Sequence, residues 1–194
     1  MTHFRIAAAA LIASTGFAAA DEPYNWTGVT GGVAYGSVTG ESILSSLTTG
    51  AVQSRTGVSD ETPTSAYVGV NYQHGSFVIG GEITFTDYSS TLDSNPANTF
   101  DNLTEVRARL GYAFDRIHVY GTVGHAELDL NYIGAQALGT GTVYGLGAEY
   151  AVHDNVIVGL EYTQTEVSAD FGAPFNQRGT IELEAARLRV GLRF

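Results

Sequence analysis

The sequence predicts an all-β protein, an eight-stranded antiparallel up-and-down transmembrane β-barrel preceded by a signal peptide. Three observations support this fold class. The chain of 194 residues opens with a short apolar stretch. After it, apolar residues alternate with small or polar ones, which is the periodicity of strands. Short and long connections then alternate between the strand-like segments, as in an up-and-down sheet.

The expected signal peptide covers residues 1–20. Arg5 provides a basic start, 6–17 an apolar core, and Ala18 to Ala20 a small-residue cleavage site. The apolar core is shorter than the roughly 20 residues that a membrane-spanning helix needs. An uncleaved anchor or a buried amphipathic helix is the alternative. Cleavage after Ala20 leaves residues 21–194 as one exported barrel domain.

Eight segments show the alternation that is typical of strands. They are 26–38, 65–73, 76–88, 103–114, 117–130, 140–152, 156–168 and 180–194. Tight connections rich in Gly, Asp and Asn lie at 73–75, 115–116 and 153–155. Longer connections lie at 39–64, 89–102, 131–139 and 169–179. Bacterial outer-membrane barrels have the same asymmetry, with short periplasmic turns and longer outer loops.

Each segment has one bulky apolar face and one face of small or charged residues. In the last segment the bulky face carries Leu188, Val190, Leu192 and Phe194. Further up this segment the phase changes, because Ile181 and Leu183 have the opposite parity. A bulge, or a strand end beyond the membrane, is expected there.

Alternation does not decide which face lies inside. A soluble lipocalin-like barrel places its apolar face inward. The interior of an eight-stranded barrel, however, is just wide enough for side chains to fill. The face rich in Gly, Thr and Ser suits that narrow space, and the bulky face suits lipid. Aromatic residues gather near the short turns, as in an interfacial girdle. The sequence therefore favours a membrane barrel.

The composition excludes several classes of function. The net charge is -11, with 20 acidic and 9 basic residues, whereas nucleic-acid binding requires a basic surface. There is no Cys, so the chain has neither a disulfide nor a thiolate metal site. The five His and the carboxylates show no metal-binding motif. No metal or other cofactor is expected.

Charged residues are expected in the lumen, by their parity. They are Glu82, Glu105, Arg107, Arg109, Glu149, Glu161, Arg187 and Arg189. Because isolated charges in a narrow lumen are costly, they should pair. Glu82 with Arg107 or Arg109 is the first expected pair, and Glu149 and Glu161 should face the two Arg of the last segment. A salt-bridged core is favoured over a selectivity filter.

Four stretches resemble alphaproteobacterial OmpA-like outer-membrane β-barrel proteins, the porin-family or opacity-like barrels. They are Trp26-Thr27-Gly28, Val70 to Gln73 followed by Phe77 to Glu82, Val106 to Ala113 running into Asp115-Arg116, and Arg189 to Phe194. The resemblance covers the mature chain except the long loops. His125 departs from the pattern, which usually has an apolar or small residue there.

The resemblance implies a structural or surface-interaction role in the outer membrane, without enzymatic activity, for a monomeric or loosely associated protein. Implied partners are outer-membrane lipid and lipopolysaccharide, the outer-membrane assembly machinery, and a host or surface ligand held by the long loops. The row Leu188, Val190, Leu192 and Phe194 resembles the signal that the assembly machinery reads. The expected loops carry the acidic residues Glu41, Asp60, Glu61, Asp93 and Asp170. They could repel anions, bind divalent cations shared with lipopolysaccharide, or simply be solvated.

Two other functions remain open. One is a narrow channel for ions or very small solutes. The other is an enzyme that modifies lipid A, because lipid-A deacylases use a Ser-His pair with an acid on an eight-stranded barrel. His125, Glu127 and Ser168 are the residues that such an enzyme would use here, although nothing in the sequence brings them together.

Overall fold

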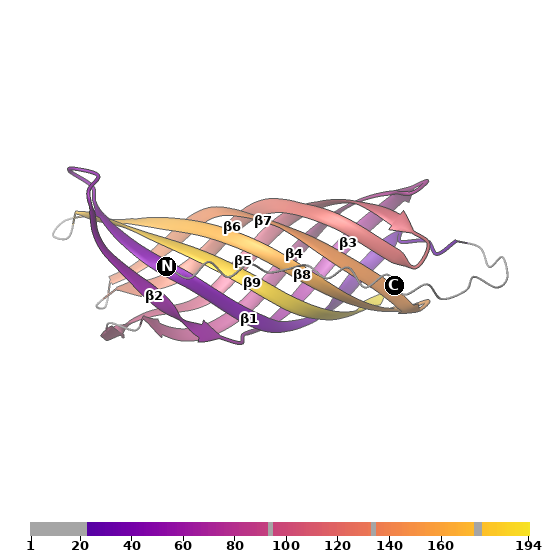
Figure 1. Ribbon diagram of the computed structural model, residues 1–194, viewed down its shortest axis with the longest axis horizontal. Helices are drawn as coiled ribbons and strands as arrows, with labels where there is room; N and C mark the ends of the chain where they lie inside the picture. Colours follow the sequence, from indigo (N-terminus) through magenta and orange to yellow (C-terminus); the bar gives the residue numbers. More distant parts are fainter. Residues whose placement is uncertain (1–22, 93–94, 133–134, 173–175) are drawn as a thin grey trace, which may run out of the picture.

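The computed structural model describes residues 23–92, 95–132, 135–172 and 176–194, which form nine antiparallel strands (Figure 1). The expected signal peptide lies outside these residues. The strands are β1 (Gly28–Ser46), β2 (Val52–Glu61), β3 (Thr64–His74), β4 (Phe77–Leu92), β5 (Asn95–Phe114), β6 (Ile117–Tyr132), β7 (Ala135–His153), β8 (Val156–Phe171) and β9 (Gln177–Arg193). The described residues contain no helix long and apolar enough to cross a membrane.

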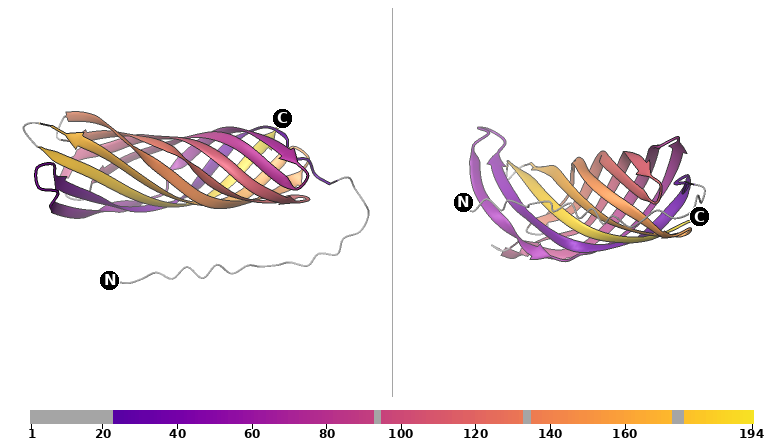
Figure 2. Two further views of the ribbon diagram at one scale, coloured as in Figure 1. Left: turned by 90° about the horizontal axis from the view of Figure 1, so that it is seen from above. Right: turned by 45° about the vertical axis from the view of Figure 1, so that its right-hand side comes forward.

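The strands close into a ring, and the all-β barrel prediction is confirmed. Sequential neighbours pair from β3 to β9, and β1 pairs with β3 on one side and with β9 on the other. The β1–β9 ladder is unbroken from Thr30↔Arg193 to Ser46↔Gln177. The result is a long cylinder whose strands are tilted relative to its axis (Figure 2).

Nine strands occupy eight positions in this ring, because β2 and β3 share one position. The lower half of β1 pairs with β3, from Gly28↔Asn71 to Tyr35↔Thr64. Its upper half pairs with β2, from Val38↔Glu61 to Ser45↔Val52. Thr62 and Pro63 separate the two strands, and Pro cannot donate a ladder hydrogen bond. One of the eight positions in the ring is therefore divided at Pro63 into two strands, β2 and β3.

The strands are longer than predicted, and the expected long loops are mostly strand. β1 and β2 occupy 39–61 with only a short connection at 47–51, and 89–102 belongs almost wholly to β4 and β5. β6 and β7 likewise occupy most of 131–139, and β8 and β9 extend into 169–179. We call the end with the 47–51 connection the upper end, and the end with the short turns the lower end.

An apolar belt surrounds the lower half of the barrel. Most outward-facing residues there are large apolar side chains that remain exposed, for example Val29, Val33 and Tyr35 on β1. Tyr144 to Val152 of β7 spans about 27 Å of strand at roughly 3.3 Å per residue, or about 20 Å of height at the tilt of such barrels. That height is close to the apolar band of outer-membrane barrels.

The lumen is filled in three layers. A lower core consists of Tyr24, Trp26, Val78, Ala113, Ala151 and Ile157. A charged layer lies in the middle. An upper core consists of Val38, Tyr88, Leu103, Ala126, Leu128, Val143, Val167, Ile181, Leu183 and Ala185. Above the belt the pattern is thus inverted, with apolar side chains inside and polar ones outside.

The inversion explains the phase change in the last predicted strand. Ile181 and Leu183 point inward on the same face as Arg187 and Arg189, and all four are buried. β9 has no register shift against β8 or β1, so there is no bulge. The expected alternative holds instead, since the strand continues beyond the belt. The inner face changes from charged to apolar where the outer face changes from apolar to polar.

Candidate functional site

The charged layer is formed by the eight residues expected in the lumen. They come from β4 (Glu82), β5 (Glu105, Arg107, Arg109), β7 (Glu149), β8 (Glu161) and β9 (Arg187, Arg189). Each is at most 4% exposed. Four carboxylates face four guanidinium groups, so the layer is formally neutral.

Glu82 lies at the centre of the layer and contacts three guanidinium groups. Its carboxylate accepts hydrogen bonds from Arg109 at 3.0 Å and from Arg189 at 2.5 and 3.0 Å. It also pairs with Arg107, which stands directly opposite it in the β4–β5 ladder. Thus both partners expected for Glu82 contact it, together with a third from β9.

The other carboxylates connect β5 to the far wall. Glu161 accepts from Arg107 at 3.0 Å and from Arg189 at 2.7 Å. Glu149 accepts from Arg109 at 2.7 Å and lies 3.7 Å from Arg189. The Glu161–Arg189 pair joins the neighbouring strands β8 and β9, whereas the other three contacts cross the lumen between strands that do not pair with each other. The ion pairs therefore tie opposite walls of the barrel together.

Glu105 and Arg187 form the upper edge of the charged layer. Arg187 lies 3.5 Å from Glu105 and 3.9 Å from Glu161. Glu105 also accepts a hydrogen bond from the Thr165 hydroxyl at 3.1 Å. A buried carboxylate is tolerated when several hydrogen-bond donors surround it, and Glu105 meets this condition.

Two inward Tyr and one His belong to the layer although they were not predicted. The Arg109 guanidinium lies 3.8 Å from the centre of the Tyr120 ring, and Arg189 lies 3.9 Å from that of Tyr67. Tyr120 donates to Glu161 at 2.8 Å, and His118 Nδ1 lies 3.3 Å from Glu149. Parity alone places them inside; they were missed because aromatic residues were assigned to lipid.

Inward glycines make room for these rings. A Cβ at Gly147 would lie 2.3 Å from Tyr120 Cζ, and one at Gly191 would lie 2.3 Å from the Tyr67 hydroxyl. Such distances are far inside normal contact, so only Gly fits at either position. The expectation that the face rich in Gly, Thr and Ser lies inside agrees with this geometry.

The proposed lipid-A constellation does not come together. His125 and Glu127 lie on the outer face of β6, where His125 Nε2 is 3.8 Å from Glu127. Thr140 of β7 stands in register between Glu127 and Ser168 of β8. Two strand spacings, about 10 Å, therefore separate the acid from the serine backbone. His118, on the inner face, is on the other side of the wall.

The outer face above the belt is acidic. Its exposed carboxylates are Glu41, Asp87, Asp101, Glu127, Asp129, Glu166, Asp170, Glu182 and Glu184. The bases among them are Arg55, which is 3.3 Å from Glu41, and Arg178, which donates to Asp170 at 2.5 and 2.8 Å. The Arg178 guanidinium lowers the pKa of Asp170 below its ordinary value. Of the acidic loop residues, Asp60 and Glu61 fall on β2, and Asp93 lies outside the described residues.

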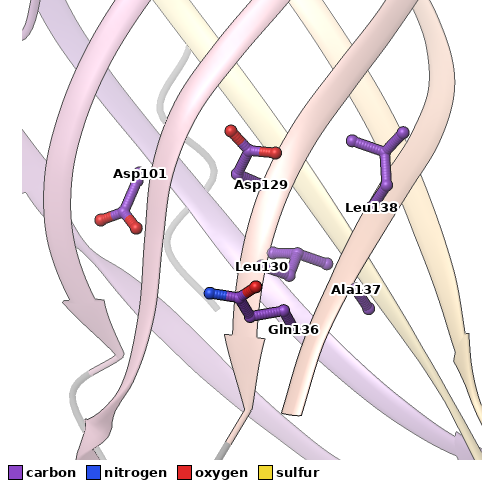
Figure 3. Close-up of a pocket in the computed structure, with 6 residues that line it drawn as sticks. All are labelled: Asp101, Asp129, Leu130, Gln136, Ala137 and Leu138. Carbon is purple, nitrogen blue, oxygen red and sulfur yellow. The ribbon is translucent and has the colours of Figure 1, made fainter. Parts of the chain in front are cut away.

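A cleft of about 390 Å³ lies at the upper end of this acidic surface (Figure 3). Asp101 from β5 and Asp129 from β6 flank it, and Gln136 and Leu138 from β7 complete it. A bulge between Phe100 and Leu103 turns Asp101 to the outside. Among the described residues, no group of three or more His, Cys, Asp or Glu is placed to hold a metal ion.

The row expected to act as an assembly signal lies on the belt. Leu188, Val190, Leu192 and Phe194 are 54%, 45%, 48% and 78% exposed. The Phe194 backbone N–H donates to Val29 O at 2.8 Å, so the chain end is fixed to β1. The role of the row in assembly stays a prediction.

Comparison with known proteins gives a family and a shared fold. The model of the outer membrane protein beta-barrel domain matches residues 6–194. No curated protein matches the sequence. The outer membrane protein OprG from Pseudomonas aeruginosa aligns with a TM-score of 0.52 and 12% identity, over 89% of this chain and 98% of its own.

Two further solved structures are similar. Ail, the attachment invasion locus protein of Yersinia pestis, aligns with a TM-score of 0.51 and 15% identity, over 87% of this chain and 99% of its own. The outer membrane protease OmpT from Escherichia coli aligns with a TM-score of 0.46 and 8% identity, over 88% of this chain and 98% of its own. The similarity to OprG and Ail shows a common barrel fold.

Proposed function

Because the chain belongs to the outer membrane protein beta-barrel domain family, we propose that it is a closed, non-enzymatic barrel that supports the envelope and makes contacts at the cell surface. Its location is the cell outer membrane. The observation that carries the proposal is the filling of the lumen by two apolar cores with a neutral ion-paired layer between them.

The charged layer supports a structural role over a conducting one. A conducting lumen needs charged groups that water and ions can reach. Here each of the eight charged residues is at most 4% exposed, and each carboxylate is paired with a guanidinium group. Ions would have to break several of these pairs to pass. The layer is instead suited to hold the walls of the barrel together.

The upper half of the barrel supports a role in surface contact. On β1 the belt ends near Tyr35, and the strand continues to Ser46. Eleven residues at about 3.3 Å each, tilted as in such barrels, rise roughly 25–30 Å. Short turns face the periplasm in these proteins, so the upper end faces outward. The acidic outer face would then be presented to the surroundings of the cell.

Single cysteines test this orientation, because the chain has no Cys of its own. Thr49→Cys, in the 47–51 connection, and Glu184→Cys, on the acidic face, should react with a membrane-impermeant maleimide on intact cells. His153→Cys, in a lower turn, should react only after the cells are broken. Labelling of the His153 variant on intact cells, with Thr49 protected, would overturn the orientation and the surface role with it.

A further inference from the structure

The segment Tyr24–Thr27, which precedes β1, fills the lower mouth of the barrel. Trp26 is fully buried and Tyr24 is 7% exposed. The Trp26 ring lies 5.0 Å from the Tyr24 ring and 5.0 Å from the His118 ring. His118 in turn contacts Glu149 of the charged layer. Tyr24 and Trp26, the two large rings of the lower core, therefore lie between the charged layer and the lower opening.

Hydrogen bonds attach this segment to all three short turns. Trp26 N–H donates to Gln73 Oε1 at 2.7 Å, next to the β3–β4 turn. In the β5–β6 turn, Asp115 accepts from Tyr24 N–H at 2.8 Å and from Trp26 Nε1 at 3.0 Å. In the β7–β8 turn, the Asp154 carbonyl accepts from the Tyr24 hydroxyl at 3.0 Å.

The last strand holds the same segment from the other side. Arg193 of β9 donates to the Thr27 carbonyl at 3.1 Å, and its guanidinium lies 4.8 Å from the centre of the Tyr24 ring. The partners of the segment thus come from residues 73 to 193. They meet only when β9 has closed the ring against β1.

Two backbone features shape this seat. Asp115 has φ 54°, a left-handed conformation that Asp tolerates, and both its carboxylate and its carbonyl accept from the segment. Gly28 has φ 147° where the chain enters β1, and a Cβ there would lie 2.6 Å from Phe194 O. Only Gly allows the chain to turn from the wall of the barrel into its mouth.

We propose that Tyr24–Thr27 is a latch that docks after ring closure and seals the lumen against the periplasm. The latch is separate from the wall, since the β1–β3 ladder begins only at Gly28. Its release would expose His118 and the charged layer behind it without breaking a single strand pair. The device regulates access to the lumen from one side and leaves the acidic upper surface unchanged.

Chemical modification of His118 tests the latch. The refolded full-length protein is treated with diethylpyrocarbonate, and the modified histidines are identified by mass spectrometry. His125, whose side chain is 57% exposed, is the internal reference. In the wild type, His118 should react at least about tenfold more slowly than His125, because it becomes reactive only on local opening. In Trp26→Ala it should react at a rate approaching that of His125.

Two further variants separate the latch from general destabilisation. Gly28→Ala should also expose His118, although it keeps every aromatic ring. Phe77→Ala, which removes an exposed aromatic ring at the same end of the barrel, should leave His118 protected. Heat-modifiable gel migration confirms that each variant is folded. The latch is refuted if His118 reacts as fast as His125 in the wild type, or stays protected in folded Trp26→Ala or folded Gly28→Ala.

Discussion

Glu82 contacts three guanidinium groups of the lumen, two from β5 and one from β9. A buried carboxylate in this position stays ionised only because these guanidinium groups surround it. Removing one partner leaves a charge with fewer contacts in a poorly hydrated space. The residues of the charged layer should therefore be strongly coupled in their effects on stability.

Arg107→Ala should lower the free energy of unfolding by about 3–5 kcal/mol, the range for a broken buried ion pair. Glu82→Ala should also be destabilising, and the double variant should cost less than the sum of the two single variants. Urea unfolding of the protein in lipid vesicles measures all three. The matched control is Arg55→Ala in the exposed pair with Glu41, which should cost at most about 1 kcal/mol. Additive single effects would show that the pair is not coupled.

Gly147→Ala should be destabilising although it adds a single methyl group. The new Cβ would meet the Tyr120 ring at 2.3 Å, and Tyr120 is itself fixed by Glu161 and Arg109. Overpacking of this kind costs about 1–3 kcal/mol. Gly57→Ala on β2 is the control, since nothing lies within 4 Å of its Cβ position. Stability is measured as the temperature at which the folded form disappears in heat-modifiable gel migration. Equal stability of the two variants would contradict the assigned packing.

Parity in the sequence was sufficient to place the charged residues inside, because each lies between residues of the apolar face. The same parity separates His118, which is buried, from His125, whose side chain is 57% exposed. Tyr67 and Tyr120 were not predicted as lumen residues, because aromatic side chains were assigned to the lipid face by residue type and their parity was not used. Glu149 and Glu161 do contact Arg residues of the last segment, as expected. The pairs that join β5 to β7 and β8 were not predicted, since they depend on the stagger of strands that do not pair.

At the scale of elements, the upper ends of the strands were the main error. They were predicted as loops because the predicted strand limits rest on the bulky apolar residues of the lipid face. Above the belt the outer face turns polar, as with Glu182 and Glu184 on β9, while the inner face turns apolar. Backbone pairing does not stop where the membrane environment ends. The same inverted alternation continues into the expected loop 169–179, where Ala169 and Phe171 are buried and Asp170 is exposed.

Phe194→Ser should impair assembly in cells more than it impairs stability. The side chain is 78% exposed, so little packing is lost, and the backbone bond to Val29 remains available. If the row from Leu188 to Phe194 is read by the assembly machinery, the amount of folded protein in the outer membrane should fall several-fold. Refolding of purified protein into detergent should be nearly normal.

The matched control is Phe77→Ser, which changes another exposed aromatic at the same end of the belt. It should assemble at normal yield. Normal yield of folded Phe194→Ser in cells would contradict the signal role. Residues 40–61 contain paired strand on both sides of the 47–51 connection. Deletion within the 47–51 connection should therefore leave folding intact, whereas deletion of the whole of 40–61 should not.

At the scale of the whole molecule, the protein is one continuous barrel that is membrane-like below and resembles a soluble protein above. The ring topology and the short lower turns could be predicted, because they depend on local alternation and turn residues. The split of one wall position into β2 and β3 could not, since it depends on how the upper half of β1 pairs. The acidic outer face follows from the same inversion of the strand pattern.

The claim that the lumen is closed is tested most directly by planar-bilayer conductance of the purified, refolded protein. Because two apolar cores and a neutral ion-paired layer fill the interior, the account predicts no stepwise conductance above that of the bilayer alone in concentrated KCl. Heat-modifiable migration of the same sample must show folded barrel. Reproducible single-channel steps from folded wild-type protein would contradict the account and establish the chain as a pore.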